Sequence, residues 1–356
     1  MSTGSKSSRI TPAEGLLRFT SAITQVLLFV CPFTTAPKKF RDLSCDSACA
    51  RTSSRGIVCR CLATSFSLKL IMVLSVIAIC SSVAKGNEET QSLEPPLFDF
   101  ATLLLVIFSV VIGIWFVRSG QGTLKRQNHI GSRISPQLAV VLCFAMFVLS
   151  GIGAWLGDSI SSDSAIQSTA WMYGGAIATQ IPILFLYVNL QKKPKWHHTV
   201  STVCVTFAVF VPIALVVAAI SHAILVFAGL ESQSNLGHST LEQLADTSWG
   251  FSAWVVVLCV TLGAGIVEEL MYRGLILPAF NTVIGGKSPW RAIVATSVVF
   301  AVMHIGAAES SAILGLFVLS IGLCWARVKS GGILAPIVIH ILFNAINIAF
   351  VYSTHL

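Results

Sequence analysis

Apolar residues recur in long runs along most of this chain, and short polar segments separate them. The runs lie near residues 63–83, 99–117, 137–156, 169–189, 199–228, 250–280, 292–306, 311–326 and 332–352. A helix needs about 20 predominantly apolar residues to cross a bilayer, and most of the runs meet that length. The pattern predicts an all-α, polytopic bundle of transmembrane helices with about eight or nine spans.

The connections between the runs alternate in charge. The basic residues of every second connection are Arg118, Lys125, Arg126, Arg133, Lys192, Lys193, Lys195, Lys287, Arg291, Arg327 and Lys329, and the connections between them are neutral or acidic. Because cytoplasmic loops carry an excess of Lys and Arg, the alternation predicts one orientation. The N-terminus is expected in the cytoplasm and the C-terminus on the outer side of a multi-pass integral membrane protein.

Composition agrees with this topology. Hydrophobic residues make up 54% of the 356 positions and charged residues only 11%, against about 25% charged in an ordinary soluble domain. The net charge of +8 comes largely from the basic connections, so it indicates orientation and not a nucleic-acid partner. The expected partner common to all the runs is the lipid bilayer.

The N-terminal segment differs from the rest of the chain. Residues 1–62 are rich in Ser, Thr, Arg and Lys and poor in acids, which predicts a basic arm that is disordered or serves as a targeting sequence. Residues 63–249 carry few ionisable side chains within their apolar runs and are expected to form accessory transmembrane helices.

Polar side chains inside the apolar runs concentrate in the C-terminal part of the chain. They occur in three short segments, EELMYR (268–273), FAVMH (300–304) and HILFN (340–344), and comprise Glu268, Glu269, Arg273, His304, His340 and Asn344. Glu269 and Arg273 are four residues apart, and the same spacing relates Phe300 to His304 and His340 to Asn344. Residues at this spacing share one face of a helix, so each segment can turn its pair to one side.

The depth of these residues predicts a single site. At a rise of about 1.5 Å per residue, Glu268 and His304 each lie about 20 Å from the cytoplasmic end of their helix, and His340 and Asn344 lie at about 16 and 22 Å. Four polar groups on three helices thus reach a similar depth in a hydrocarbon layer about 30 Å thick. We expect one intramembrane polar active site, reached from the cytoplasmic side.

The residue types indicate hydrolysis. A carboxylate and a histidine can together hold a water molecule and take its proton, which suits Glu268 and His304. A second histidine and an asparagine can donate hydrogen bonds to a developing oxyanion. Two structural roles stay open, because Glu269 with Arg273 can be a structural ion pair, and His340 with Asn344 can be a polar contact between helices. Glu268 is harder to explain structurally, since Arg273 compensates only one carboxylate.

Other hydrolase and transport classes lack their motifs. The sequence has no H-E-x-x-H segment for a zinc protease, no G-x-S-x-G nucleophile turn and no Gly-rich phosphate loop. A transporter would place comparable polar centres in both halves of the chain, and residues 63–228 show none.

In order and spacing, the three segments resemble the E-E-x-x-x-R, F-x-x-x-H and H-x-x-x-N motifs of the type II CAAX prenyl endopeptidases, which include the bacterial CPBP or Abi proteins. The resemblance covers roughly residues 250–350. It implies a catalytic membrane domain at 250–352 and an intramembrane protease that cleaves a peptide bond near the cytoplasmic face. Tyr272 departs from the family pattern, in which phenylalanine is common.

The resemblance also assigns roles. Glu268 and His304 would activate water, His340 and Asn344 would form the oxyanion hole, and Glu269, Arg273 and Phe300 would support them. It implies a membrane-associated peptide or protein substrate, prenylated or not, and we expect a metal-free centre in preference to a zinc site. The alternative function is a non-proteolytic membrane scaffold or a bacteriocin-immunity protein on the same fold.

Overall fold

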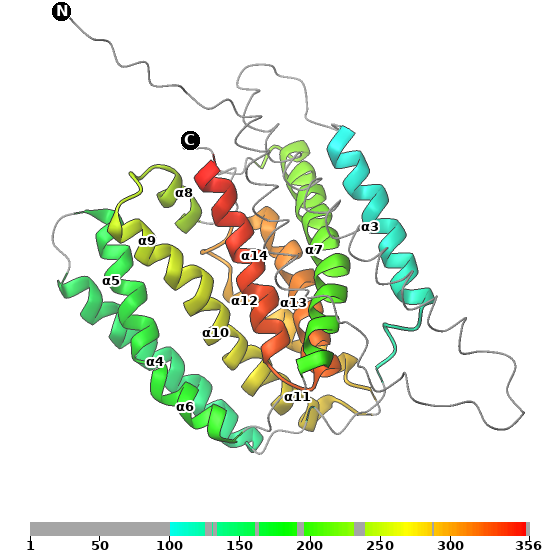
Figure 1. Ribbon diagram of the computed structural model, residues 1–356, viewed down its shortest axis with the longest axis horizontal. Coiled ribbons are helices and arrows are strands. Elements are labelled where there is room, and N and C mark those ends of the chain that lie inside the picture. Colours follow the sequence, from blue (N-terminus) through cyan, green and yellow to red (C-terminus); the bar gives the residue numbers. More distant parts are fainter. Residues whose placement is uncertain are drawn as a thin grey trace, which may run out of the picture.

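The computed structural model describes residues 100–124, 130, 134–160, 164–190, 196–230, 239–286 and 288–353. These residues form helices and no strands, in agreement with the expected all-α class (Figure 1). The helices before the motifs are α3 (Phe100–Arg118), α4 (Pro136–Ile160), α5 (Ala165–Ala178), α6 (Ile181–Leu190), α7 (Trp196–Phe227) and α8 (Ser239–Ala245). The predicted arm 1–62 and the predicted span 63–83 lie outside the described residues.

The rest of the chain forms one long interrupted helix and three further helices. The long helix comprises α9 (Phe251–Leu258), η3 (Cys259–Gly263), α10 (Ala264–Glu269), η4 (Leu270–Ile276) and α11 (Leu277–Ile284). It is followed by α12 (Trp290–Met303), α13 (Ser310–Ser330) and α14 (Leu334–Ser353).

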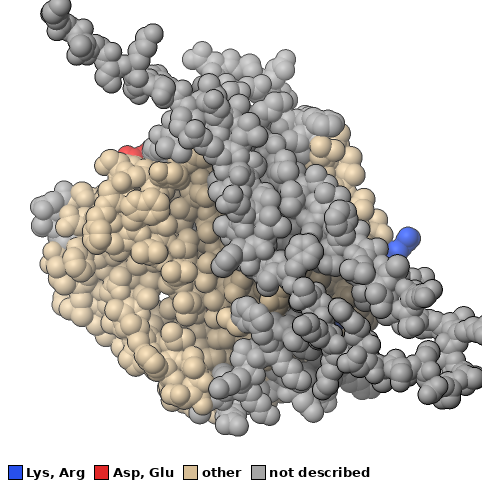
Figure 2. Space-filling view, viewed as in Figure 1, with Lys and Arg blue, Asp and Glu red and all other residues tan. Residues whose placement is uncertain are grey.

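Membrane character is a property of most of these helices. Within the described residues, six are long and apolar enough to cross a bilayer, with α5–α6 and α9–α11 each taken as one, and two shorter apolar helices accompany them. Many of their outward side chains are large and apolar, such as Val140, Phe144 and Phe185, which suits contact with lipid. The described surface in Figure 2 carries almost no charged side chains. The chain is therefore an integral membrane protein with multiple helices.

The predicted span 169–189 lies within one apolar stretch, Ala165–Asn189, that is long enough to cross a bilayer, but its helix is interrupted. α5 ends at Ala178 and α6 begins at Ile181, next to Pro182, which has no backbone N–H to continue the helical hydrogen bonds. The Thr179 hydroxyl donates a 2.8 Å hydrogen bond to the carbonyl of Leu149 on α4. This bond fixes the break against the neighbouring helix.

Glycines allow the closest helix contacts. On α4, Gly153 lies against the backbone of Gly175 and Gly157 lies against Trp171 of α5, which is the small-residue packing common in membrane bundles. On α13, the position of a Cβ on Gly315 would be 2.8 Å from the Ala214 carbonyl of α7. α7 and α13 thus form the buried centre of the bundle, and their core includes Phe207, Phe210, Leu319, Leu323 and Trp325.

Two π-helical turns interrupt the long helix on either side of the glutamates. In η3 the N–H of Ala264 donates to the carbonyl of Cys259, five residues back. At the end of η4 the N–H of Leu277 likewise donates to the carbonyl of Tyr272. Such wide turns change the direction in which the following side chains point and occur often at functional sites. The short α-helical segment between them carries Glu268 and Glu269.

Candidate active site

Glu269 is the centre of a buried charge network. Its Oε1 atom accepts a 2.7 Å hydrogen bond from the Arg273 guanidinium, one helical turn away, and neither side chain is exposed to solvent. The same oxygen lies 2.7 Å from Nδ1 of His340 on α14. A buried carboxylate needs such partners, because burying a charge without them is costly. Glu269 and Arg273, which are predicted to support the site, thus lie together in one network, with His340 as a third member.

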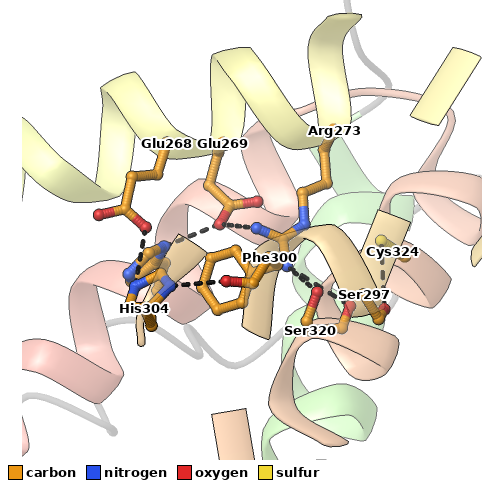
Figure 3. Close-up of polar contacts among 9 residues, drawn as sticks. Glu268, Glu269, Arg273, Ser297, Phe300, His304, Ser320 and Cys324 are labelled. Atoms are coloured by element: carbon orange, nitrogen blue, oxygen red, sulfur yellow. Dashed lines mark hydrogen bonds and ion pairs between the residues drawn. The ribbon is translucent and has the colours of Figure 1, made fainter. Parts of the chain in front are cut away.

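Arg273 is held from its other sides as well. Its second terminal nitrogen donates to Ser320 on α13, at 2.8 Å to the hydroxyl and 3.4 Å to the carbonyl. Its guanidinium carbon lies 4.7 Å from the centre of the Phe300 ring, within the range of a cation–π interaction. Three helices therefore converge on this arginine, as Figure 3 shows.

Glu268 points to the other side of the same segment and faces His304 (Figure 3). The Glu268 Oε2 and His304 Nε2 atoms are 3.7 Å apart, and both side chains are partly exposed, at 27% and 17%. This separation is too long for a direct hydrogen bond. One water oxygen beside the line between the two atoms would be within hydrogen-bond distance of both. The pair therefore has the geometry to hold a water molecule.

The backbone fixes the protonation pattern of His304. Its Nδ1 lies 2.8 Å from the carbonyl oxygen of Phe300, which can only accept, so Nδ1 carries the proton. The remaining nitrogen, Nε2, faces Glu268 and has a free lone pair when the ring is neutral. The helix runs from Trp290 to Met303, and His304 is its C-cap. The predicted span 292–306 therefore begins two residues after the helix starts and extends three residues past its end. The side chain of Phe300 packs against the His304 ring, and the two ring centroids are 4.4 Å apart.

His340 and Asn344 each use one donor inside the protein. The Glu269 carboxylate can only accept, so Nδ1 of His340 is the donor in that bond and Nε2 is the ring nitrogen left over. The side-chain amide of Asn344 donates a 2.9 Å hydrogen bond to the carbonyl of Val260 in η3. In a regular α-helix this carbonyl would accept from the N–H of Ala264, but in the wide turn that N–H donates to the carbonyl of Cys259 instead. The amide has a second N–H for another acceptor.

A cavity of about 730 Å³ connects these residues. All four predicted catalytic residues line it, as does Phe300, whereas the predicted supporting residues Glu269 and Arg273 do not. Its walls come from α4, α5, α7, α8, the long helix, α12, α13 and α14. The apolar lining includes Met146, Phe147, Val267, Met271, Leu316, Leu319, Phe343 and Ile348. The four residues thus share one predominantly apolar chamber.

The cavity occupies one half of the bundle. It is lined by the C-terminal part of α7, from Ala214 to His222, and by the N-terminal part of α13, from Ser311 to Leu319. These parts lie toward the end of the bundle that carries α8 and the end of α14 (Figure 1). The basic residues Arg118 and Lys329 lie in the last turns of α3 and α13, at the other end of the bundle (Figure 1). The cavity therefore extends away from the end of the bundle that carries these basic residues. The sequence predicts that the site is reached from that end, which is the expected cytoplasmic side.

Ligands for a metal ion are sparse. Among the described residues, no three His, Cys, Asp or Glu side chains gather as a group that could hold one ion. Glu269 and His340 are bonded to each other, which leaves Glu268 and His304 as the facing pair. The absence of a metal from the reaction stays a prediction.

Sequence reasoning did not find two features of this region. Ser320, which binds Arg273, lies within an apolar run and has no motif around it. Gln180, which lines the cavity from the break between α5 and α6, lies beside Pro182, and that proline is the one local signal for the break.

The fold and the site define a helical integral membrane protein in which a buried charge network lies next to a facing glutamate–histidine pair. Residues 250–346 match the family model described as Type II CAAX prenyl endopeptidase Rce1-like. This match confirms the resemblance seen in the three motifs: the matched segment is similar to Rce1-like domains, a family that implies a protease. Helices α3 to α8 lie outside the match. Comparisons with curated proteins and with solved structures each gave no match.

Proposed function

We propose that the protein is an intramembrane endopeptidase that hydrolyses a peptide bond of a membrane-associated peptide or protein. The observation that carries the proposal is the facing pair of Glu268 and His304, 3.7 Å apart on the wall of a cavity within the membrane domain. The match to a protease family supports the same reaction class.

In the proposed reaction, a water molecule lies between Glu268 Oε2 and His304 Nε2. Glu268 takes a proton from the water as the oxygen attacks the carbonyl carbon of the peptide bond. The resulting tetrahedral intermediate collapses with cleavage of the C–N bond, and the proton passes to the leaving amine. The products are a free carboxylate and a free amine, so water is the single co-reactant.

The proposed oxyanion hole consists of His340 and Asn344. The second N–H of Asn344 is free to donate to the oxyanion once the first is bonded to Val260. Because the Nδ1 proton of His340 is committed to Glu269, Nε2 can donate only when the ring is an imidazolium. We propose that Glu269 stabilises this positive charge and Arg273 limits the excess negative charge on Glu269.

The substrate is proposed from the shape and lining of the cavity. A chamber of about 730 Å³ is large enough for a short extended peptide together with an apolar group. A prenylated C-terminal peptide is one substrate of this kind, and an unmodified membrane-associated peptide is another. We propose that the substrate enters from the end of the bundle that carries α8, because the cavity lies in that half.

A cleavage assay tests the proposal. The purified protein in nanodiscs is offered a peptide library with and without a C-terminal prenyl-cysteine, and products are identified by mass spectrometry. We expect cleavage by the wild type and none by Glu268→Ala or His304→Ala. Cleavage that persists in both variants would sink the assignment, and the scaffold alternative would then take its place.

A further inference from the structure

A buried side-chain carbonyl oxygen without a hydrogen-bond partner borders the cavity outside the matched family segment. Gln180 lies at the break between α5 and α6, is only 6% exposed and lines the cavity. Its side-chain Oε1 is buried with no hydrogen-bond partner. A buried carbonyl oxygen without a hydrogen-bond donor is unfavourable, so its presence in a cavity wall points to a ligand that donates to it.

The helix contacts place Gln180 at the height of the proposed catalytic pair. Helices α5 and α6 run in the same direction as the long helix, with Ile177 against Gly263 and Tyr187 against Gly274. Gln180 is three residues beyond Ile177, which brings it level with Ile266 and Val267. Glu268 is less than one helical turn from that level. A substrate bond in contact with Glu268 would therefore lie at the level of Gln180 in the cavity that both residues line.

The position of Gln180 is fixed by its backbone and neighbours. Its own N–H bonds to the carbonyl of Ile177, and its carbonyl accepts from Ile183 and Leu184. The preceding residue, Thr179, is bonded to α4 through its hydroxyl. The side chain therefore starts from a backbone position that is fixed against its neighbours.

A peptide main chain is the ligand that fits this amide. A primary amide carries a carbonyl that accepts and an NH₂ that donates, and a peptide group offers the matching N–H and C=O. Main-chain groups in a predominantly apolar intramembrane chamber need partners from the protein, because unpaired ones are costly there. We propose that Gln180 binds the main chain of the substrate beside the bond that is hydrolysed. This inference rests on the proposed function and makes α5–α6 part of the substrate site.

The first test separates binding from chemistry. The probe is a CAAX heptapeptide in farnesylated and unmodified forms, assayed with wild type, Gln180→Met and Gln180→Asn. Methionine has nearly the size of glutamine but no amide group. Asparagine keeps the amide on a side chain that is shorter by one methylene. We expect KM to rise about 5- to 100-fold in both variants, with kcat within about 3-fold, since the lost bond is made equally in the bound and transition states.

The second test locates the contact on the substrate. A series of heptapeptides carries one N-methyl group at each amide nitrogen in turn, which removes one N–H. At one position next to the scissile bond, N-methylation should weaken binding to the wild type and have no additional effect on Gln180→Met. Identical N-methylation profiles for the two proteins, or an unchanged KM in both variants, would overturn the inference.

The matched control is Thr296→Val. Thr296 is fully buried with an unpartnered hydroxyl and does not line the cavity, so its replacement should leave KM unchanged. Thermal unfolding of each variant identifies any loss of structure. If cleavage depends on Glu268 but KM is insensitive to Gln180, only this inference fails. If Glu268→Ala cleaves as well as wild type, the proposed function fails first.

Discussion

Glu269 and His340, which are 71 positions apart in the sequence, form a buried 2.7 Å hydrogen bond between two helices. The same carboxylate oxygen binds Arg273, so one atom joins the long helix to α14 and, through Arg273, to Ser320 on α13. This arrangement separates the two adjacent glutamates by role. Glu269 binds Arg273 and His340 in the interior, and Glu268 faces the cavity, so we expect Glu269 to serve stability and Glu268 to serve chemistry.

The first prediction concerns stability. Glu269→Gln leaves the buried charge of Arg273 without compensation, which should lower the free energy of unfolding by about 3–5 kcal/mol. Thermal or denaturant unfolding in detergent micelles measures this. Glu268→Gln is the matched control, one residue away and partly exposed, and should leave the transition unchanged. Equal losses in the two variants would contradict the division of roles.

The local contacts were predictable from the sequence. The four-residue spacing placed Glu269 and Arg273 on one helix face, and the 2.7 Å ion pair confirms that they meet. The apolar runs from 99–117 onward likewise coincide with helices, because burial in lipid requires long apolar segments. These features depend on period and length, which a single sequence contains.

Other features required the tertiary structure. The π-helical turns lie in CVTLG and LMYRGLI, which carry no local signal for a wide turn. The bond of Asn344 to the Val260 carbonyl depends on such a turn and on helix packing. The pairing of His340 with Glu269, and not with Glu268, depends on how two helices rotate about their axes. Spacing fixes faces within a helix, but it does not fix which faces meet.

The second prediction concerns His340. Its replacement by Gln removes an imidazolium donor from the proposed oxyanion hole, and the expected loss in kcat is about 10²–10³-fold. KM should change little, because the oxyanion forms only in the transition state. Steady-state kinetics on a peptide cleaved by the wild type provide the measurement. A variant with wild-type kcat would show that His340 serves only the packing of α14.

The third prediction concerns access to the cavity. Cys259 lines it, and a membrane-impermeant maleimide should label Cys259 from the face that carries α8. Vesicles with the protein in one orientation, with every other cysteine replaced, allow the two faces to be labelled separately. Lys329→Cys, at the opposite end of α13, reports the other face. Labelling of Cys259 from the face that exposes Lys329→Cys would refute the proposed entry path.

The fourth prediction concerns metal ions. Glu268 and His304 face each other, and Glu269 and His340 are bonded together, so the site offers few free ligands to a zinc ion, which in catalytic centres takes three protein ligands. Cleavage should therefore be unchanged after prolonged treatment with a strong chelator. Loss of activity that added zinc restores would replace the metal-free mechanism with a metal-assisted one.

The central claim is that Glu268 activates the water that cleaves the peptide bond. The most direct measurement is kcat/KM for one identified peptide with wild type and Glu268→Gln in the same nanodiscs, with unfolding transitions compared in parallel. The account predicts a loss of about 10²–10⁴-fold in kcat/KM together with an unchanged transition. A Glu268→Gln variant that folds as the wild type does and cleaves at the wild-type rate would contradict it.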